Sequence, residues 1–414
     1  MLLAEAGPIS YRQGFSMNTP SSEQPKFLVI GSLAASILNF RGQMIEDAAR
    51  AGYEIHCVVY PEDDRQVVAN IRAKGWICHT LQVTRKGMNP FEDLKYLSQL
   101  RRLLRDLRPE KIFSYTIKPV IYTGLALWGL QRPRTTGQRA LRSCAMITGL
   151  GYAFMGQTLR QKLVGLLVRL LYRFSLRFHD LVAFQNPDDM ALFRTLRLLG
   201  ASQRVIRVNG SGVSLETFHK APFPPPTPIR FLMIARVLRA KGFREYLAAA
   251  GVIRAEYGNH VDFSCLGPFD NGGDGIPREE FLNACVTSGV RYLGETQDVR
   301  PYLADCHVMV LPSYREGLPR SVLEAMAIGR PIITSDAPGC RETVIEGENG
   351  FFVEPRNSKS LEVALRRMVE IQKSNPGALE QMGSRSREIA IERFDVRSVN
   401  KTLLEQFQVI RSKV

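Results

Sequence analysis

The sequence has few cysteines, and none of them stands in a spacing that forms a familiar site. Its seven cysteines are scattered over 414 residues, their number is odd, and no two of them make a C-x-x-C motif. This pattern argues against a disulfide framework and against a zinc site, and it fits a protein kept in a reducing cytoplasm.

Long apolar runs are also missing. No stretch reaches the roughly eighteen consecutive apolar residues that a transmembrane helix needs, so the sequence predicts no membrane span. Residues 1–25 lack the basic start and apolar core of a secretory signal, and their Ser, Pro and Gly content predicts a disordered extension. Met1 and Met17 are both possible starts of the protein.

Acidic residues are scarce in the first half of the chain. Residues 1–225 contain 30 Lys and Arg against 16 Asp and Glu, so this half carries +14 of the net charge of +15. Such asymmetry predicts that the N-terminal half faces a polyanion, which is either acidic lipid or nucleic acid. A nucleic-acid-binding protein is the less favoured reading, because the sequence has no basic-aromatic motif and no recognised binding module.

Short apolar runs alternate with amphipathic stretches, which predicts an α/β protein with Rossmann-like domains. The pattern starts at residue 26, with a small-residue loop at 31–36 and a first helix predicted over 39–51, and it starts again near residue 230, after a segment rich in proline. A G-x-G-x-x-G motif is absent, which argues against a tightly bound dinucleotide. We expect an N-terminal domain at 26–215, a linker at 216–228 and a second domain at 229–392.

Residues 312–344 carry the strongest functional pattern. An apolar run that ends at Leu311 predicts a buried strand. Pro319 suits the first position of a helix and Gly329 its end, which predicts a helix over 319–328. The loop between them then lies at the carboxyl edge of a sheet, where α/β folds bind ligands. In that loop the amides of Gly317 and Leu318, together with the helix N-terminus, attract an anion such as phosphate.

Two acids in this unit, Glu316 in the loop and Glu324 in the helix, have seven residues between them. Taken alone, they read as a loop acid and a solvated helix residue. Within PSYREGLPRSVLEAMAIGRPIITSDAPG, however, the pair resembles the donor-site signature of retaining GT-B glycosyltransferases, a group that includes sucrose and glycogen synthases. The resemblance implies two Rossmann-like domains facing each other across a cleft, with the segment 393–414, and in it a final helix expected over 394–409, crossing back to the first domain.

The same resemblance implies roles for individual residues. Glu316 is expected to lie against the transferred sugar, Glu324 to hold the ribose hydroxyls, and the backbone of Gly339 to approach the donor. Arg236 and Lys241 match the two cations that face the donor diphosphate, where fixed charges stabilise the departing group. The resemblance implies a UDP-sugar as co-substrate and no metal or other cofactor. No D-x-D motif, the usual metal-binding motif of the other large glycosyltransferase fold, occurs.

Outside this signature, the loops expected to face the nucleotide match those of the resembled glycosyltransferases at fewer residues. Gly31 stands in the loop that closes over the donor diphosphate in relatives, where two glycines are common. The backbone at Leu293 is expected to receive the nucleotide base. Phe40 and Arg41 stand where relatives contact the acceptor, and the alternative is a core Phe beside a surface Arg.

Two more positions are assigned to the acceptor. Lys118 follows a predicted strand at 111–115, where it either meets an anionic substrate group or is simply solvated. Many relatives have a His at this position, so no general base is assigned here. Thr148 lies in SCAMITGLGYAFMG, a segment without charge and rich in glycine whose composition suits a loop at the acceptor mouth.

A helix is predicted over 159–178, with basic residues along one face and leucines largely on the other. The basic residues are Lys162, Arg169, Arg173 and Arg177. This pattern is typical of an amphipathic helix on an anionic membrane, where each basic residue contributes about 1 kcal/mol. The alternative is a core helix with a cationic rim.

The motifs SYTIKP and ITGLGYAF look like those of bacterial family 4-like enzymes that extend undecaprenyl-diphosphate-linked sugars, often with N-acetylgalactosamine. We therefore expect a retaining, metal-independent hexosyltransferase on the inner face of the plasma membrane. Its donor is a UDP-sugar and its acceptor a polyprenyl-diphosphate-linked saccharide. In the mechanism that the family favours, a donor phosphate oxygen helps to take the acceptor proton. A UDP-sugar epimerase of the same fold is the alternative, but the sequence shows no acid/base residues for it.

Overall fold

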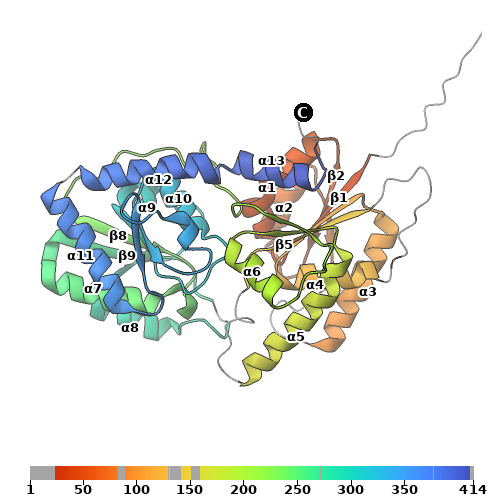
Figure 1. Cartoon of the computed structure of the whole chain (residues 1–414), viewed down its shortest axis with the longest axis horizontal. Coiled ribbons are helices and arrows are strands. Elements are labelled where there is room, and N and C mark those ends of the chain that lie inside the picture. The colour runs from red at the N-terminus through yellow and green to blue at the C-terminus, as the bar shows by residue number, and fades with distance from the viewer. Residues whose placement is uncertain are drawn as a thin grey trace, which may run out of the picture.

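The chain folds into two α/β domains that lie side by side (Figure 1). The computed structural model describes residues 24–82, 89–128, 130, 141–150, 159–270, 272–375 and 377–410. In this part of the chain all pairings between the named strands are parallel. The predicted fold class, α/β with two Rossmann-like domains, is confirmed.

The first domain is built on a seven-stranded sheet with the order β3-β2-β1-β4-β5-β6-β7. Its strands are β1 (Lys26–Ile30), β2 (Glu54–Val59), β3 (Ile77–Thr80), β4 (Lys111–Tyr115), β5 (Arg142–Ile147), β6 (Leu181–Phe184) and β7 (Arg204–Arg207). Its helices are α1 (Ala34–Arg50), α2 (Arg65–Ala73), α3 (Pro90–Leu107), α4 (Ile117–Trp128), α5 (Leu159–Ser175), the short η2 (Leu176–Phe178) and α6 (Pro187–Thr195).

The second domain has a six-stranded sheet with the order β10-β9-β8-β11-β12-β13. Its strands are β8 (Ile229–Ile234), β9 (Val261–Leu266), β10 (Arg291–Tyr292), β11 (Val308–Leu311), β12 (Ile332–Ser335) and β13 (Gly350–Val353). Its helical elements are η3 (Arg239–Lys241), α7 (Phe243–Tyr257), η4 (Gly258–His260), α8 (Arg278–Ser288), α9 (Arg300–Asp305), α10 (Arg320–Ile328), η5 (Arg341–Thr343), α11 (Ser358–Ser374) and α12 (Ala378–Phe394).

The last two helices connect the domains. Helix α12 packs on α10 of the second domain, and α13 (Val396–Gln406) packs on α1 of the first. Figure 1 shows both helices running along the same side of the molecule. Apolar side chains of α13, Leu403 and Leu404 among them, belong to the buried core of the first domain. The end of the chain therefore fixes one domain against the other.

Several helix boundaries differ from the sequence-based expectation. The first helix was expected from Asn39 but begins at Ala34, because the Asp63 side chain accepts a hydrogen bond from the Ala34 amide at 3.1 Å. The small-residue loop before it is correspondingly shorter. The expected single helix over 394–409 is interrupted at Asp395, whose side chain caps the start of α13. Helix α6, which carries functional contacts described below, was not predicted.

None of the helices in the described part of the chain is long and apolar enough to cross a membrane.

Candidate active site

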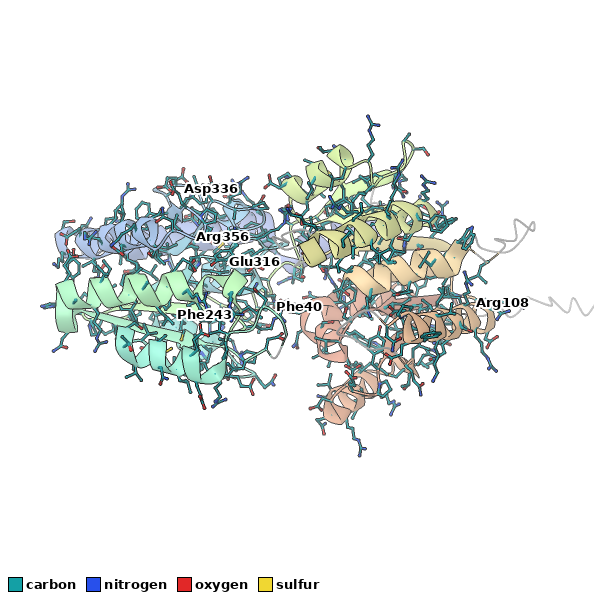
Figure 2. All side chains as sticks on the ribbon, turned by 90° about the horizontal axis from the view of Figure 1, so that it is seen from below. Phe40, Arg108, Phe243, Glu316, Asp336 and Arg356 are labelled. Atoms are coloured by element: carbon teal, nitrogen blue, oxygen red, sulfur yellow. The ribbon has the colours of Figure 1, made fainter. Side chains whose placement is uncertain are left out.

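The candidate site lies where the carboxyl edges of the two sheets meet. Figure 2 shows Glu316 and Phe40 near the junction, one on each domain. In the second domain, residues 312–319 connect β11 to α10, and Pro319 stands at the N-cap position of that helix. The expected strand, loop and helix are therefore present, with the helix beginning at Arg320.

The backbone of Glu316 is held by the neighbouring loop after β12. Its amide donates a hydrogen bond to the Pro338 carbonyl at 2.9 Å. The next residue, Gly339, has φ +80°, and a Cβ built on it would collide with the backbone carbonyls of Glu316 and Gly317. Only glycine fits so close to the loop, so Gly339 sets the position of Glu316 through the backbone.

We expect Gly339→Ala to lower kcat by about ten-fold or more, because the added methyl group must displace the Glu316 backbone. Gly347→Ala is the matched control: Gly347 has a similar φ of +81°, but no atom lies within 4 Å of the added Cβ. Both variants share the strain of roughly 1–2 kcal/mol for an L residue in this conformation. Equal turnover in the two variants would remove Gly339 from the site.

The Glu316 carboxylate forms an ion pair with Lys241, which lies in η3. The hydroxyl of Ser313 donates a second hydrogen bond to the same carboxylate oxygen at 2.7 Å. Both charged side chains are largely buried, with 20% of Lys241 and 12% of Glu316 exposed. The structure thus brings together one predicted cation and one predicted acid that are 75 residues apart in sequence.

Arg236, the other predicted cation, does not reach Glu316. Its guanidinium donates to Asp270 at 2.8 Å, and its side chain is 59% exposed. In this conformation Asp270 provides the nearer carboxylate for Arg236. A role for Arg236 at a donor diphosphate stays a prediction.

Glu324 lies one turn into α10 and is paired with Arg320 of the same helix at 2.9 Å. Burial raises the pKa of Glu324, and the nearby Arg320 guanidinium opposes that rise. Arg320 also reaches across to the first domain: it donates to the Asn39 carbonyl at 2.7 Å and lies over the Phe40 ring at 5.4 Å. The acid predicted to hold ribose is thus placed at the domain junction.

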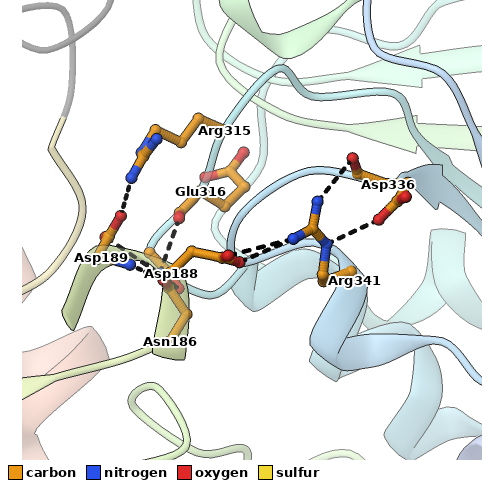
Figure 3. Close-up of polar contacts among 8 residues, drawn as sticks. Asn186, Asp188, Asp189, Arg315, Glu316, Asp336 and Arg341 are labelled. Carbon is orange, nitrogen blue, oxygen red and sulfur yellow. Dashed lines mark hydrogen bonds and ion pairs between the residues drawn. The ribbon is translucent and has the colours of Figure 1, made fainter. Parts of the chain in front are cut away.

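The first domain contributes a cluster on α6 that the sequence analysis missed (Figure 3). Asn186 caps α6 by accepting from the Asp189 amide at 2.7 Å. Its side-chain amide also donates across the junction to the carbonyls of Gly317, at 2.8 Å, and Glu316, at 3.3 Å. Asp189, which is fully buried, pairs with Arg315 of the second domain. The residues beside and behind Glu316 are therefore tied to the opposite domain.

A second ion pair lies next to this one. Asp188 pairs with Arg341 at 3.2 Å, and Arg341 also contacts Asp336 of its own domain (Figure 3). Both partners of the Asp188 pair are more than one third exposed. One sequence signal was available for this cluster: Asn-Pro-Asp-Asp after an apolar strand is a typical helix start. The pairing with Arg315 and Arg341 could not be read from it.

Most of the other residues predicted to contact the donor are closely packed against other parts of the chain. Gly31 is packed against the Tyr115 ring, where any Cβ would collide, and its carbonyl accepts from the Tyr60 hydroxyl at 2.7 Å. Gly317 has no room for a Cβ against the Thr148 carbonyl. Leu318 packs over Gly210 of the first domain. Close packing accounts for these small residues, and their contacts with a donor stay predictions, as does that of Leu293.

The residues predicted to contact the acceptor differ in where the structure places them. Phe40 is 41% exposed and Thr148 borders Gly317, so both lie at the junction. Lys118 pairs with Asp93 of α3 at 3.1 Å, so it is not simply solvated. Its contact with an acceptor stays a prediction. Arg41 is only 2% exposed, beneath the rings of Phe113 and Tyr115, and burial lowers its pKa to about 10. In this conformation Arg41 is neither a surface residue nor accessible to an acceptor.

Two hydroxyls that the sequence analysis did not single out also lie at this edge. Ser32, after β1, and Thr116, after β4, contact each other through their side chains. Thr116 has φ +70°, which is uncommon for a β-branched residue and is held by the surrounding structure. Among the described residues no group of three or more His, Cys, Asp or Glu side chains is placed to hold a metal ion.

Helix α5 begins at Leu159 as expected, but its leucines are not buried. Leu163, Leu166, Leu167 and Leu170 are 45–60% exposed, whereas Val168 and Tyr172 face the core. The leucine face is therefore not the face that α5 turns to the core, and Val168 and Tyr172 form the core face instead. Of the predicted basic residues, Lys162, Arg173 and Arg177 are exposed, and Arg169 donates to the Gly165 carbonyl of its own helix at 3.1 Å.

Two facing Rossmann-like domains, with an acid and a lysine paired at their junction, have the architecture of the GT-B fold. Two family profiles agree: residues 33–186 match "Glycosyl transferase 4-like" and residues 228–370 match "Glycosyl transferases group 1". The chain belongs to the GT-B glycosyltransferases that combine these two domains.

Similar proteins come from several bacteria. Over 352 residues the chain is 29% identical to the N,N'-diacetylbacillosaminyl-diphospho-undecaprenol alpha-1,3-N-acetylgalactosaminyltransferase of Campylobacter jejuni, covering 82% of this chain and 88% of the relative. It is 22% identical to the capsular polysaccharide biosynthesis glycosyltransferase CapM of Staphylococcus aureus, covering 83% and 87%.

Solved structures show the same fold. Sucrose-phosphate synthase from Thermosynechococcus elongatus superposes with a TM-score of 0.71 at 18% identity, covering 92% of this chain and 98% of that one. HepE of Anabaena, solved in complex with UDP, superposes with a TM-score of 0.69 at 16% identity, covering 93% and 100%.

Proposed function

We propose that the protein transfers an N-acetylhexosamine from a UDP-sugar to a saccharide carried on a polyprenyl diphosphate, in the assembly of a bacterial surface polysaccharide or glycan. The observation that carries this proposal is the buried Lys241–Glu316 pair at the domain junction. The similarity to an undecaprenol-linked N-acetylgalactosaminyltransferase supports the sugar and the acceptor, and a relative of the same fold was solved with UDP.

The proposed mechanism uses the two charges of the site. Glu316, held by Pro338 and Ser313, lies against the sugar and supports the positive charge that develops at its anomeric carbon. Lys241 stabilises the negative charge on the departing UDP, and a fixed cation there needs no reorganisation during the reaction. We propose retention of configuration, with a donor phosphate oxygen taking the acceptor proton and no requirement for a metal, as the resemblance to retaining enzymes implies.

We also propose that the first domain lies on the inner face of the plasma membrane through α5. Its four exposed leucines form one stripe, since positions 163, 166, 167 and 170 recur at helical spacing. An exposed apolar stripe flanked by basic residues is the surface that lies in a membrane interface. A lipid-linked acceptor would then be met at the membrane.

The proposed activity predicts UDP release that depends on both substrates. With UDP-N-acetylhexosamines and a short-chain polyprenyl-diphosphate saccharide, we expect UDP release at least about ten-fold faster than with UDP-glucose, unaffected by a chelator. NMR of the product should show the same anomeric configuration as in the donor. Inversion would contradict the mechanism, and interconversion of UDP-sugars without acceptor would establish the epimerase instead.

A further inference from the structure

A cavity lined by four arginines opens on the first domain outside the candidate active site. Its volume is about 600 Å³, and Arg173, Arg177, Arg194 and Arg197 surround it together with small and apolar residues. Arg173 and Arg177 come from the end of α5 and from η2, and the other two come from the end of α6 and the residues after it. We call this the arginine pocket.

The arginine pocket lies far from the donor site. Helices α5 and α6 each end just before a strand of the parallel sheet begins, so their carboxyl ends lie at the amino edge of that sheet. The candidate active site lies at the opposite, carboxyl edge. With 17 residues, α5 is roughly 25 Å long and spans this separation. A ligand in the pocket therefore cannot be the sugar donor or the reacting end of the acceptor.

The charge of the pocket is uncompensated within the described part of the chain. No carboxylate there pairs with any of the four arginines, and the pocket lining contains no acid. Four guanidinium groups around one hollow repel one another unless an anion lies between them. Their planar forks match phosphate oxygens in pairs, so phosphate is the anion that this geometry suits.

The backbone at Arg197 has an uncommon left-handed conformation. After α6 the chain turns through Arg197 with φ +52°, and the Leu198 amide donates to the Phe193 carbonyl at 2.9 Å to close the helix. Glycine is the usual residue at this left-handed position, since an L side chain is strained there. This turn brings residues 198–201 into the lining of the pocket.

The pocket continues the exposed stripe of α5. Arg173 and Arg177 follow Leu166 and Leu170 by seven positions each, which is two helical turns on the same side. Phe174, between them, packs against Trp128, whose ring is 59% exposed. Tryptophan at the edge of an apolar surface is typical of the level of the lipid headgroups.

We propose that the arginine pocket binds the phosphate of an anionic phospholipid headgroup, beside the leucine stripe that lies among the acyl chains. This rests on the proposed membrane attachment of α5 and adds a specific headgroup site to it. Held at the stripe and at the pocket, α5 lies flat on the membrane. Its first turn, and with it the active-site end of the domain, is then kept at the membrane surface.

The test uses vesicle flotation of the full-length protein with three double variants. Arg194→Gln/Arg197→Gln removes two pocket charges without changing α5, and Arg65→Gln/Arg72→Gln removes the same charge from α2 as a control. We expect partition onto phosphatidylcholine vesicles containing phosphatidylglycerol to fall roughly ten-fold in the pocket variant and little in the control. Leu166→Ser/Leu170→Ser tests the stripe separately and should abolish binding.

The outcomes separate the pocket from the membrane proposal. If the pocket variant partitions like the control while the leucine variant does not bind, the headgroup site is overturned and the attachment through α5 stands. If wild type binds no vesicle, both are overturned. Pocket-dependent binding of inorganic pyrophosphate with unchanged partition would make a soluble phosphate the ligand. A lower melting temperature with unchanged partition would make the arginines helix-end stabilisers, against the proposal.

Discussion

Glu316→Gln is expected to lower kcat by about 10²–10³-fold and to leave the protein folded. Glutamine keeps the size of the side chain and its hydrogen bond from Ser313, which is 2.7 Å in the native protein. It removes the negative charge that faces Lys241 and, in the proposed mechanism, the sugar. Losing one preorganised electrostatic contact of this kind typically costs two to three powers of ten in rate.

The measurement is UDP release at saturating donor and acceptor, together with the melting temperature and the affinity for UDP. Glu348→Gln is the control, because Glu348 makes a surface ion pair with Arg385 and such pairs contribute little. Lys241→Met should give a loss of similar size, and the double variant should be little worse than either one, since the two side chains act as a unit. Turnover near that of the native protein in Glu316→Gln would remove this acid from the mechanism.

Arg236 provides a contrast within the same loop. Its pair with Asp270 is one of an arginine that is 59% exposed, and such pairs contribute little. The sequence resemblance ranked Arg236 and Lys241 equally, whereas the structure places only Lys241 on Glu316. Arg236 pairs with Asp270, which lies 34 residues away in sequence. The position of Asp270 depends on the fold of its loop, so the local sequence around Arg236 does not reveal this pair.

The elements that the sequence predicted well are those specified by local patterns. The strand ending at Leu311 and the helix ending at Ile328 are set by an apolar run, a proline and a glycine close together in the chain. The start of α1 was missed because its cap, Asp63, lies 29 residues away. Local periodicity contains no information about such a partner.

Burial was harder to predict than helix position. The pattern of α5 gave the helix and its two faces, but not which face is covered. Its leucines look like core residues in sequence, and they are exposed because the chain packs α5 on α4 through Val168 and Tyr172 instead. Arg41 shows the reverse: a charged residue that looks solvated is covered by two aromatic rings. Both outcomes depend on tertiary contacts between distant segments.

The second large effect is expected at the ion pair that joins the domains. Asp189 has no exposed surface and Arg315 is 17% exposed, so the pair is buried between the domains (Figure 3). Burial raises the pKa of Asp189, and the Arg315 guanidinium opposes that rise. Removing one partner of a buried pair costs about 3–5 kcal/mol, because the other charge is left without compensation.

In Asp189→Asn, Arg315 either stays buried without a carboxylate partner or reaches water when the domain junction opens. Opening is the less costly of the two, since the pair lies at the interface and not inside one domain core. We expect an increased radius of gyration in small-angle scattering and a kcat lowered about ten-fold or more, because Asn186 no longer holds the carbonyls of Glu316 and Gly317. The melting temperature of each domain should change little.

Asp188→Asn is the matched control, one residue away. Its pair with Arg341 is more than one third exposed on both sides, so the loss should be at most about 1 kcal/mol and the molecule should stay closed. Equal effects of the two substitutions would show that charge near α6, and not the buried pair, holds the domains together. The double variant Asp189→Leu/Arg315→Met puts an apolar pair of similar volume in place of the buried ion pair. It should restore closure and most of kcat, since buried ion pairs are often replaced in this way without loss of stability.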